Sequence, residues 1–350
     1  MKRLIATLAT AALGLAGCAG GGAGGGSGNK AGESSSPSAA VHQPTASATA
    51  SLTVGLTYVP DIQFAPFYVA EDQGYFREAG LDITLRHHGA QESRLGALSS
   101  GSEDVVFAGG DEMMEGRSNG IDVVNWATMY QDYPVTLIVP ADSPIQNAAD
   151  LAGRRIGLPG PYGENYYALQ ALMAAHNWTE SDISVNYIGY TQAAALASGE
   201  VDAIIGFRNS DVPSVERQGV PVRTIEMLPG GLPLVGVGLG SLRPTVDAHR
   251  DDFTRMLGAL DRAVNFARSN PKETVEITAK HVPALREADN ATAAEKVLAN
   301  TIELYAGRTP LGVQDTRRWE AMATFMSEKL LREPVAAADA FVDLTGNSAH

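Results

Sequence analysis

The segment LTVGLTYVPDIQFAPFYVAEDQGYFREAGLDITL, residues 52–85, contains the first strand–helix–strand unit of the chain. Residues 52–58 have apolar side chains at every second position, which is typical of a β-strand. Residues 64–76 have helical spacing, and residues 81–87 form a second strand candidate. Strands that alternate with helices predict a parallel sheet that helices cover on both faces.

The same alternation continues outward from this unit. Further strand candidates lie at 104–109 and 122–130, and the pattern restarts after the apolar run 135–140. A second long apolar run lies at 232–240. Between the two runs, the segments that alternate between strand-like and helical patterns are 154–160, 165–177, 184–190, 192–199, 201–207, 212–219 and 220–228.

Two groups of such units joined by two apolar runs predict an α/β protein with two lobes. Each lobe is expected to be a mostly parallel sheet flanked by helices, and the apolar runs are expected to be two crossover strands. Everything after Arg243 has helical patterns, which predicts a C-terminal helical segment that returns to the first lobe. A single doubly wound domain with a helical appendage is the alternative. The expected boundaries are 52–135 for the first part of lobe 1, 136–232 for lobe 2, and 233–345 for the return strand and C-terminal helices of lobe 1.

Residues 1–18 have the pattern of a lipoprotein signal peptide. A positively charged start precedes an apolar stretch at 4–14, which is too short to span a bilayer. The sequence LAGC at 15–18 then resembles a lipobox. Cys18 is the only cysteine among 350 residues, so we expect it to be lipidated, and a disulfide within the chain is excluded. An ordinary secreted protein cleaved near Ala16 is the alternative.

The next segment and the overall charge restrict location and partners. Residues 19–51 are rich in Gly, Ser, Ala and Pro without an apolar period, which predicts a flexible tether. The formal net charge of −14 argues against binding of nucleic acid or of anionic lipid. No apolar run after residue 18 approaches the length of a membrane span. We therefore expect a monomer at the cell membrane, lipid-anchored through Cys18 on the extracytoplasmic face.

Short motifs occur in a specific order from residue 52 to about residue 330. The residues that form them are Tyr58, Pro60, Tyr68-Val69-Ala70, Gly74-Tyr75-Phe76, Gly80-Leu81-Asp82, Gly101 to Ala108, Asp150 to Gly160, and Ser198 to Gly206. Their order resembles that of the ThiY/SsuA-like family of type II periplasmic binding proteins, and it is more specific than any single motif.

The resemblance implies an extracytoplasmic receptor that closes like a hinge on a small molecule and docks on an ABC permease. Ligands in the family include thiamine pyrimidine precursors, riboflavin, and sulfonates such as taurine. The loop from Asp61 to Phe64 differs from the pyrimidine-precursor pattern, in which Asn and His follow the proline. The ligand therefore stays open among these classes, and a lipoprotein sensor that signals to a membrane kinase is an alternative with the same fold.

Open parallel sheets bind ligands beyond the carboxyl ends of their strands, at helix N-termini. Four segments meet this description, namely 58–67, 88–92, 108–112 and 157–167, and their glycines let the backbone approach a ligand closely. The candidate ligand-binding residues are Tyr58, Asp61, Gln63, Phe64, His88, Glu92, Gly110, Asp111, Glu112, Gly160, Tyr162, Glu164 and Tyr166.

The acidic and aromatic character of these segments suggests a ligand class. A sulfonate receptor would leave the helix starts free or add cations, whereas Asp111, Glu112 and Glu164 would accept hydrogen bonds from amino groups or ring N–H. A cap or first-turn role is the alternative for each carboxylate. Tyrosines and phenylalanines in the same loops would stack on a flat ring. We therefore expect a neutral or cationic, amino-bearing heteroaromatic such as an aminopyrimidine or a flavin.

The sequence lacks the metalloprotease, nucleophile-elbow and phosphate-loop motifs of common enzymes. His87 and His88 form the only histidine cluster, and adjacent strand residues point to opposite faces, so we expect no metal and no cofactor. A related pyrimidine synthase has a cysteine-rich motif, which is missing after Cys18. The sequence predicts a binding protein rather than an enzyme, with a small-molecule ligand, an ABC permease as its partner, and no nucleic acid.

Overall fold

The structure, a computed structural model, describes residues 49–89, 92–179, 181–305 and 310–346. The predicted signal peptide, Cys18 and most of the predicted tether lie outside the described residues. One compact unit runs from Ser47 to the C-terminus. Its first strand begins at Ala50, two residues before the predicted start of the folded part.

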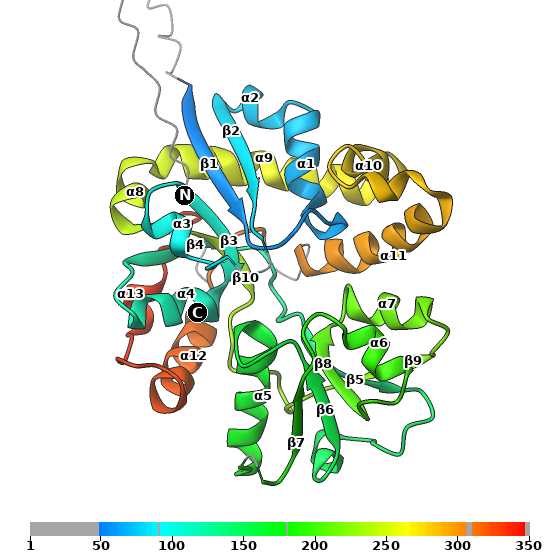
Figure 1. The fold of residues 1–350 in the computed structure, drawn as a ribbon. Coiled ribbons are helices and arrows are strands. Elements are labelled where there is room, and N and C mark those ends of the chain that lie inside the picture. Colours follow the sequence, from blue (N-terminus) through cyan, green and yellow to red (C-terminus); the bar gives the residue numbers. More distant parts are fainter. Residues whose placement is uncertain (1–48, 90–91, 180, 306–309, 347–350) are drawn as a thin grey trace, which may run out of the picture. The chain divides into compact units, whose positions relative to one another are not determined.

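The first sheet has five strands in the order β2-β1-β3-β10-β4 (Figure 1). They are β1 (Ala50–Leu56), β2 (Leu81–His87), β3 (Val105–Gly109), β4 (Val123–Thr128) and β10 (Val237–Leu242). β1 pairs in parallel with both β2 and β3. β10 lies between β3 and β4 and runs antiparallel to both.

The second sheet repeats this plan in the order β7-β6-β8-β5-β9. Its strands are β5 (Val135–Pro140), β6 (Arg155–Leu158), β7 (Ser184–Tyr187), β8 (Ala203–Phe207) and β9 (Val222–Ile225). β6 is parallel to β7 and β8, whereas β5 is antiparallel to β8 and β9. The predicted fold class is therefore confirmed: each sheet is mostly parallel, and its single antiparallel strand follows a crossover between the sheets.

The second crossover differs from the prediction in where its strand begins. The apolar run was expected to be extended over 232–240, but β10 starts only at Val237. Leu234 and Val235 are buried in a hydrophobic cluster instead. Gly236 passes so close to the backbone of Tyr130 that a side chain there would collide with its carbonyl oxygen. The first half of the run is therefore a packed connector, and only the second half joins the sheet.

Five helices on one face of the first sheet bury its larger core. They are α1 (Ala65–Asp72), α2 (Tyr75–Glu78), α9 (Arg250–Ser269), α10 (Pro271–Thr278) and α11 (Ala288–Tyr305). The predicted helix over 64–76 is divided because Gly74 has a φ of 75°, a left-handed conformation that interrupts the helix. The rings of Trp126 and Phe253 stack at 4.5 Å and join β4 to α9.

The other face of this sheet contacts shorter helices. α3 (Gly96–Ser99) and α4 (Gly110–Ser118) pack there, and α13 (Ala337–Ala340) lies beside α4 and β4. α8 (Arg243–Ala248) leads from β10 into α9. α12 (Thr316–Lys329) buries Trp319, Met322 and Met326 in a cluster shared with residues of the second sheet.

Helices also cover both faces of the second sheet. α5 (Gly163–His176) packs on one face, and α6 (Gln192–Ala197) and α7 (Asp211–Arg217) pack on the other. Three short 3₁₀ turns complete the fold: η1 (Ile62–Phe64), η2 (Ala148–Leu151) and η3 (Pro283–Arg286). Within the described ranges, no helix is both long and apolar enough to cross a membrane.

Candidate functional site

A cavity of about 480 Å³ lies where the carboxyl ends of strands from both sheets meet. The first lobe contributes the turn after β1, the end of β3, the start of α4, Arg94 and one side of α11. The second lobe contributes the segments that follow β6, β7 and β8. The volume is that of a site for a small organic molecule. The cavity therefore lies at the position that the sheet topology predicts for a ligand.

The turn after β1 places four of the predicted site residues on the cavity wall: Tyr58, Asp61, Gln63 and Phe64. An Asp61 carboxylate oxygen accepts a hydrogen bond from the Gln63 backbone N–H at 3.2 Å and so caps η1. Burial raises the pKa of Asp61, although this hydrogen bond partly opposes the shift.

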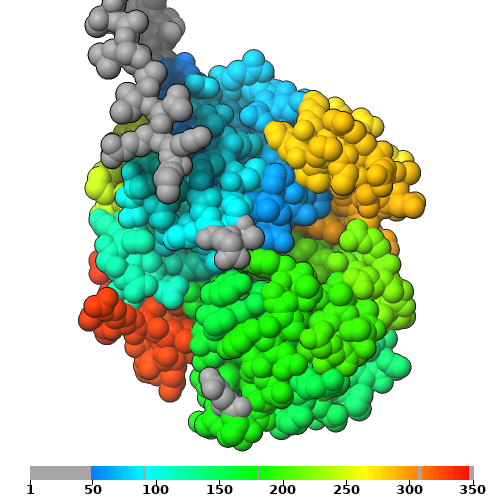
Figure 2. All heavy atoms as spheres, in the orientation of Figure 1, coloured from blue at the N-terminus to red at the C-terminus, as the bar shows by residue number. Residues whose placement is uncertain are grey.

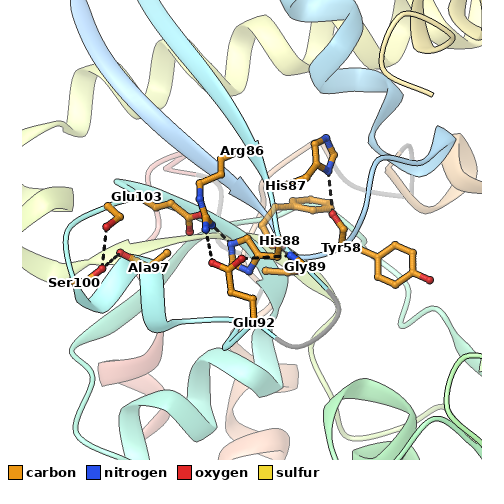
Figure 3. Close-up of polar contacts among 12 residues, drawn as sticks. Tyr58, Arg86, His87, His88, Gly89, Glu92, Ala97, Ser100 and Glu103 are labelled. Atoms are coloured by element: carbon orange, nitrogen blue, oxygen red, sulfur yellow. Dashed lines mark hydrogen bonds and ion pairs between the residues drawn. The ribbon is translucent and has the colours of Figure 1, made fainter. Parts of the chain in front are cut away.

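Behind this turn, His87 connects the cavity wall to α1. Its Nδ1 lies 2.9 Å from the carbonyl oxygen of Tyr58 (Figure 3). Its Nε2 lies 2.9 Å from the Tyr68 hydroxyl. A carbonyl oxygen can only accept, so Nδ1 donates to it, and in the neutral ring Nε2 accepts from Tyr68. Burial lowers the pKa of His87, which favours this neutral form. His87 thus stabilises the backbone that presents Tyr58 to the cavity.

Three acidic side chains lie together at the starts of α4 and α5. Glu112 and Glu164 line the cavity, and Asp111 lies behind them, fully buried. Asp111 accepts hydrogen bonds from the Tyr133 hydroxyl at 2.5 Å and from the backbone N–H of Glu112 at 2.7 Å. Burial, followed by the charge of Glu112, raises the pKa of Asp111 to about 8.

Glu164 differs from its two neighbours because one of its oxygens is unpaired. Only 8% of the residue is exposed, and its buried Oε1 has no hydrogen-bond partner in the structure. Burial raises the pKa of Glu164 well above its usual range, and the charges of Asp111 and Glu112 add to this shift. α5 starts at Gly163 with a φ of 73°, and no side chain caps this helix end.

Arg94 was not among the predicted site residues. Its Nε lies 2.6 Å from a carboxylate oxygen of Glu112, and its guanidinium group lies 5.6 Å from the centre of the Tyr162 ring. Arg94 follows the predicted segment 88–92 by only two residues, but a lone arginine in a polar stretch gave no signal for a role in the cavity.

A second acidic group lines the cavity near α7. Asp211 accepts a hydrogen bond from the Phe207 backbone N–H at 2.7 Å, and burial raises its pKa to about 6 against the effect of that bond. Arg217 of the same helix also lines the cavity. Both residues follow β8, so the rule about strand ends could have identified this segment. The residues that α11 contributes could not be found in this way, because that helix is distant in sequence from the sheets.

The two lobes contact each other directly around the cavity. The rings of Tyr58 and Tyr190 lie 5.6 Å apart at an angle of 68°. The Tyr167 hydroxyl donates to Glu115 at 2.6 Å, and the Asn209 side chain donates to Thr301 at 3.0 Å. Figure 2 shows the green surface of the second lobe against the blue and cyan surface of the first. These contacts describe a closed arrangement of the two lobes.

His88 and Glu92 are predicted site residues that lie outside the cavity lining. His88 is buried, and its Nε2 lies 2.8 Å from Glu103 (Figure 3). Arg86 contacts Glu103 at 2.6 Å and Glu92 at 2.5 Å. Both residues therefore belong to an ion-pair network inside the first lobe rather than to the cavity wall.

Three further candidates also lie outside the lining, for different reasons. Gly110 packs so tightly against Val235 that it has no room for a side chain. A side chain at Gly160 would collide with the ring of Tyr162, so this glycine permits the position of a residue that does line the cavity. Tyr166 is half-buried and packs against the core of the second lobe.

The described residues contain no group of three or more His, Cys, Asp or Glu side chains that could coordinate a metal ion. The acidic residues at the cavity are already engaged by backbone N–H groups, Tyr133 and Arg94, apart from the free oxygen of Glu164. The arrangement is thus suited to binding an organic molecule with hydrogen-bond donors and a flat ring.

Sequence comparison identifies a family and several relatives. The pattern of the NMT1/THI5 like family matches residues 61–274. Riboflavin-binding protein RibY from Chloroflexus aurantiacus is 27% identical over 295 residues, covering 82% of this chain and 84% of RibY. The formylaminopyrimidine-binding protein from Halalkalibacterium halodurans is 24% identical over 306 residues, covering 83% of this chain and 89% of that protein. A 4-amino-5-hydroxymethyl-2-methylpyrimidine phosphate synthase from Schizosaccharomyces pombe is 23% identical over 167 residues, only 47% of this chain and 48% of the enzyme.

Solved structures share the fold. The alkanesulfonate-binding protein SsuA from Xanthomonas axonopodis pv. citri, bound to MOPS, superposes with a TM-score of 0.63 at 23% identity. The superposition covers 85% of this chain and 99% of SsuA. The expected resemblance to this group of binding proteins is therefore confirmed.

The buried Asp111 predicts that stability depends on pH. Its folded-state pKa of about 8 lies above the ordinary aspartate value of 3.8, so the folded protein binds the proton more tightly than the unfolded chain. The resulting stabilisation is complete below pH 3.8 and is lost as the pH rises through about 8. Between about pH 5 and about pH 9, the free energy of unfolding is expected to fall by at least about 1 kcal/mol. Asp111→Asn should make this decrease smaller, as urea unfolding at the two pH values would measure.

The exposed Asp247 of α8 provides the matched control, since Asp247→Asn should leave the decrease unchanged. An equal decrease in wild type and Asp111→Asn would contradict the assignment.

Proposed function

The chain belongs to the NMT1/THI5-like family, and we propose that it is an extracytoplasmic solute-binding receptor of an ABC importer. It captures an amino-bearing heteroaromatic, such as a thiamine pyrimidine precursor, by closure of its two lobes. The receptor then docks on a membrane permease and releases the ligand to it. The observation that carries this proposal is the cavity of about 480 Å³ to which both sheets contribute the ends of strands.

The position of the cavity favours binding by closure. At the edge of the cavity, Tyr58 of the first lobe contacts Tyr190 of the second, and Arg94 of the first lobe lies over the ring of Tyr162. A ligand between the lobes would add contacts to both and so stabilise the closed form over an open one. Micromolar affinity requires about −8 kcal/mol of net binding free energy, which a few hydrogen bonds and one stacked ring in a closed cavity can provide.

The chemistry of the cavity favours a nitrogen heteroaromatic over a sulfonate. Asp61, Glu112, Glu164 and Asp211 outnumber the two arginines of the lining. Carboxyl oxygens accept hydrogen bonds from N–H donors, which a sulfonate group lacks, and the tyrosines and phenylalanines of the lining can stack on a flat ring. Riboflavin and formylaminopyrimidine, the compounds in the names of two relatives, both belong to this chemical class.

Binding without catalysis is the better supported function. The relatives that cover most of this chain are named as binding proteins, whereas the synthase matches less than half of it. The sequence also lacks the cysteine-rich motif of that enzyme group, since its only cysteine is Cys18. We therefore assign ligand capture, and no reaction, to the cavity.

Purified protein should retain its ligand, and native mass spectrometry should detect an amino-bearing heteroaromatic. In calorimetric titrations, riboflavin or 4-amino-5-hydroxymethyl-2-methylpyrimidine should bind, and taurine should not. Tyr190→Ala should weaken binding about tenfold, because the edge-to-face pair with Tyr58 and the aromatic wall of the cavity at this position are lost. Tyr187→Ala is the matched control, since this exposed tyrosine lies outside the cavity lining. Tight binding of taurine, with neither heteroaromatic bound, would contradict the ligand class.

We also propose that Cys18 carries the lipid that anchors the receptor. The proposal rests on the lipobox-like LAGC at 15–18 and on the lack of any other cysteine. Metabolic labelling with radioactive palmitate in a bacterial host should label the wild-type chain, and Cys18→Ser should remove the label. Label that persists in Cys18→Ser would show that the anchor lies elsewhere.

A further inference from the structure

Among the three acidic side chains at the starts of α4 and α5, only Glu164 has an unpaired buried oxygen. The two oxygens of Glu112 are engaged by the Gly109 backbone N–H at 3.1 Å and by Arg94 at 2.6 Å. Those of Asp111 accept from Tyr133 and from the Glu112 backbone N–H. Glu164 lines the cavity, is 92% buried, and leaves Oε1 without a partner. A buried polar atom without a partner is unfavourable, so a bound molecule that pairs with Glu164 would be stabilised.

We propose that Glu164 binds the ligand as a neutral carboxylic acid, through an edge that presents a hydrogen-bond donor beside a hydrogen-bond acceptor. This inference rests on the proposed function and specifies the ligand chemistry of the same cavity. The carbonyl oxygen of the acid accepts from the donor, and its O–H donates to the acceptor. An amino group next to a ring nitrogen has this pattern, and so does a ring N–H next to a carbonyl.

The surroundings of Glu164 favour its neutral form. The titratable groups near it are Asp111 and Glu112 of α4 and the guanidinium group of Arg94. Arg94 is already paired with Glu112, so one cation faces three carboxyl groups. Tyr133 contributes no charge and donates to Asp111 and to the backbone carbonyl of Glu164. The raised pKa of Glu164 agrees with this geometry.

A neutral acid at this position would select among ligands. A sulfonate offers only acceptors, and a primary ammonium group offers only donors, so neither matches both oxygens of the acid. The edge of an aminopyrimidine and the N–H/carbonyl edge of a flavin both match. Glu164 would thus be the residue that distinguishes these rings from the sulfonates bound by proteins of the same fold.

Two substitutions of Glu164 in the full chain test the inference, with riboflavin and 4-amino-5-hydroxymethyl-2-methylpyrimidine as calorimetric probes. Whichever probe the wild type binds, Glu164→Ala should weaken its binding by at least about tenfold. Glu164→Gln retains one donor and one acceptor, so its loss should be clearly smaller. As the pH rises, wild-type affinity should fall because the acid loses its proton, and Glu164→Gln should show a smaller fall. The exposed Glu200 of the same lobe lies outside the lining, and Glu200→Ala and Glu200→Gln are the matched controls.

Wild-type affinity in Glu164→Ala would overturn the inference. An equal loss in Glu164→Ala and Glu164→Gln would also overturn it, because a charged carboxylate would then be required. A wild type that binds neither probe overturns the inference as well. In that last case the receptor proposal is judged separately, by whether native mass spectrometry finds any retained small molecule.

Discussion

The two strand crossovers are the constraint on which the rest of the structure depends. After each crossover the chain enters the interior of a sheet as its one antiparallel strand, β5 between β8 and β9 and β10 between β3 and β4. Both neighbours are hydrogen-bonded to it, so the crossovers cannot slip without disrupting a sheet core. Because the chain returns to the first sheet through β10, both sheets turn the carboxyl ends of their parallel strands toward one cavity.

The cavity contains several buried carboxyl groups close together, which is unfavourable for stability. Carboxyl groups at helix starts are usually exposed and benefit from the helix dipole. Here Asp111, Glu112 and Glu164 are buried together, and only Arg94 offsets them. A protein that existed only to be stable would gain from replacing them by apolar residues. Their presence at the place where the lobes meet is explained most directly by a ligand that supplies N–H donors.

The fold was largely predictable, because the strands and helices of both sheets have a regular spacing of apolar residues that is visible in the sequence. Tyr58, Asp61, Glu112, Tyr162 and Glu164 could be found in the same way, since they directly follow strands. Arg94 and the α11 wall could not, because they reach the cavity through tertiary packing. His88 and Glu92 lie outside the cavity lining, because His88 pairs with the buried Glu103 and Glu92 pairs with Arg86.

The distance between α7 and α11 across the cavity tests the central claim of lobe closure most directly. In a Cys18→Ser background the chain has no other cysteine, so Thr292→Cys and Gln218→Cys can carry a pair of spin labels on exposed positions of the two lobes. With the retained ligand bound, electron–electron double resonance should give one short distance. After removal of the ligand, a longer population should appear, while a control pair at Thr292 and Asp82 within the first lobe stays unchanged. An unchanged distance between the lobes in the two states would contradict the account.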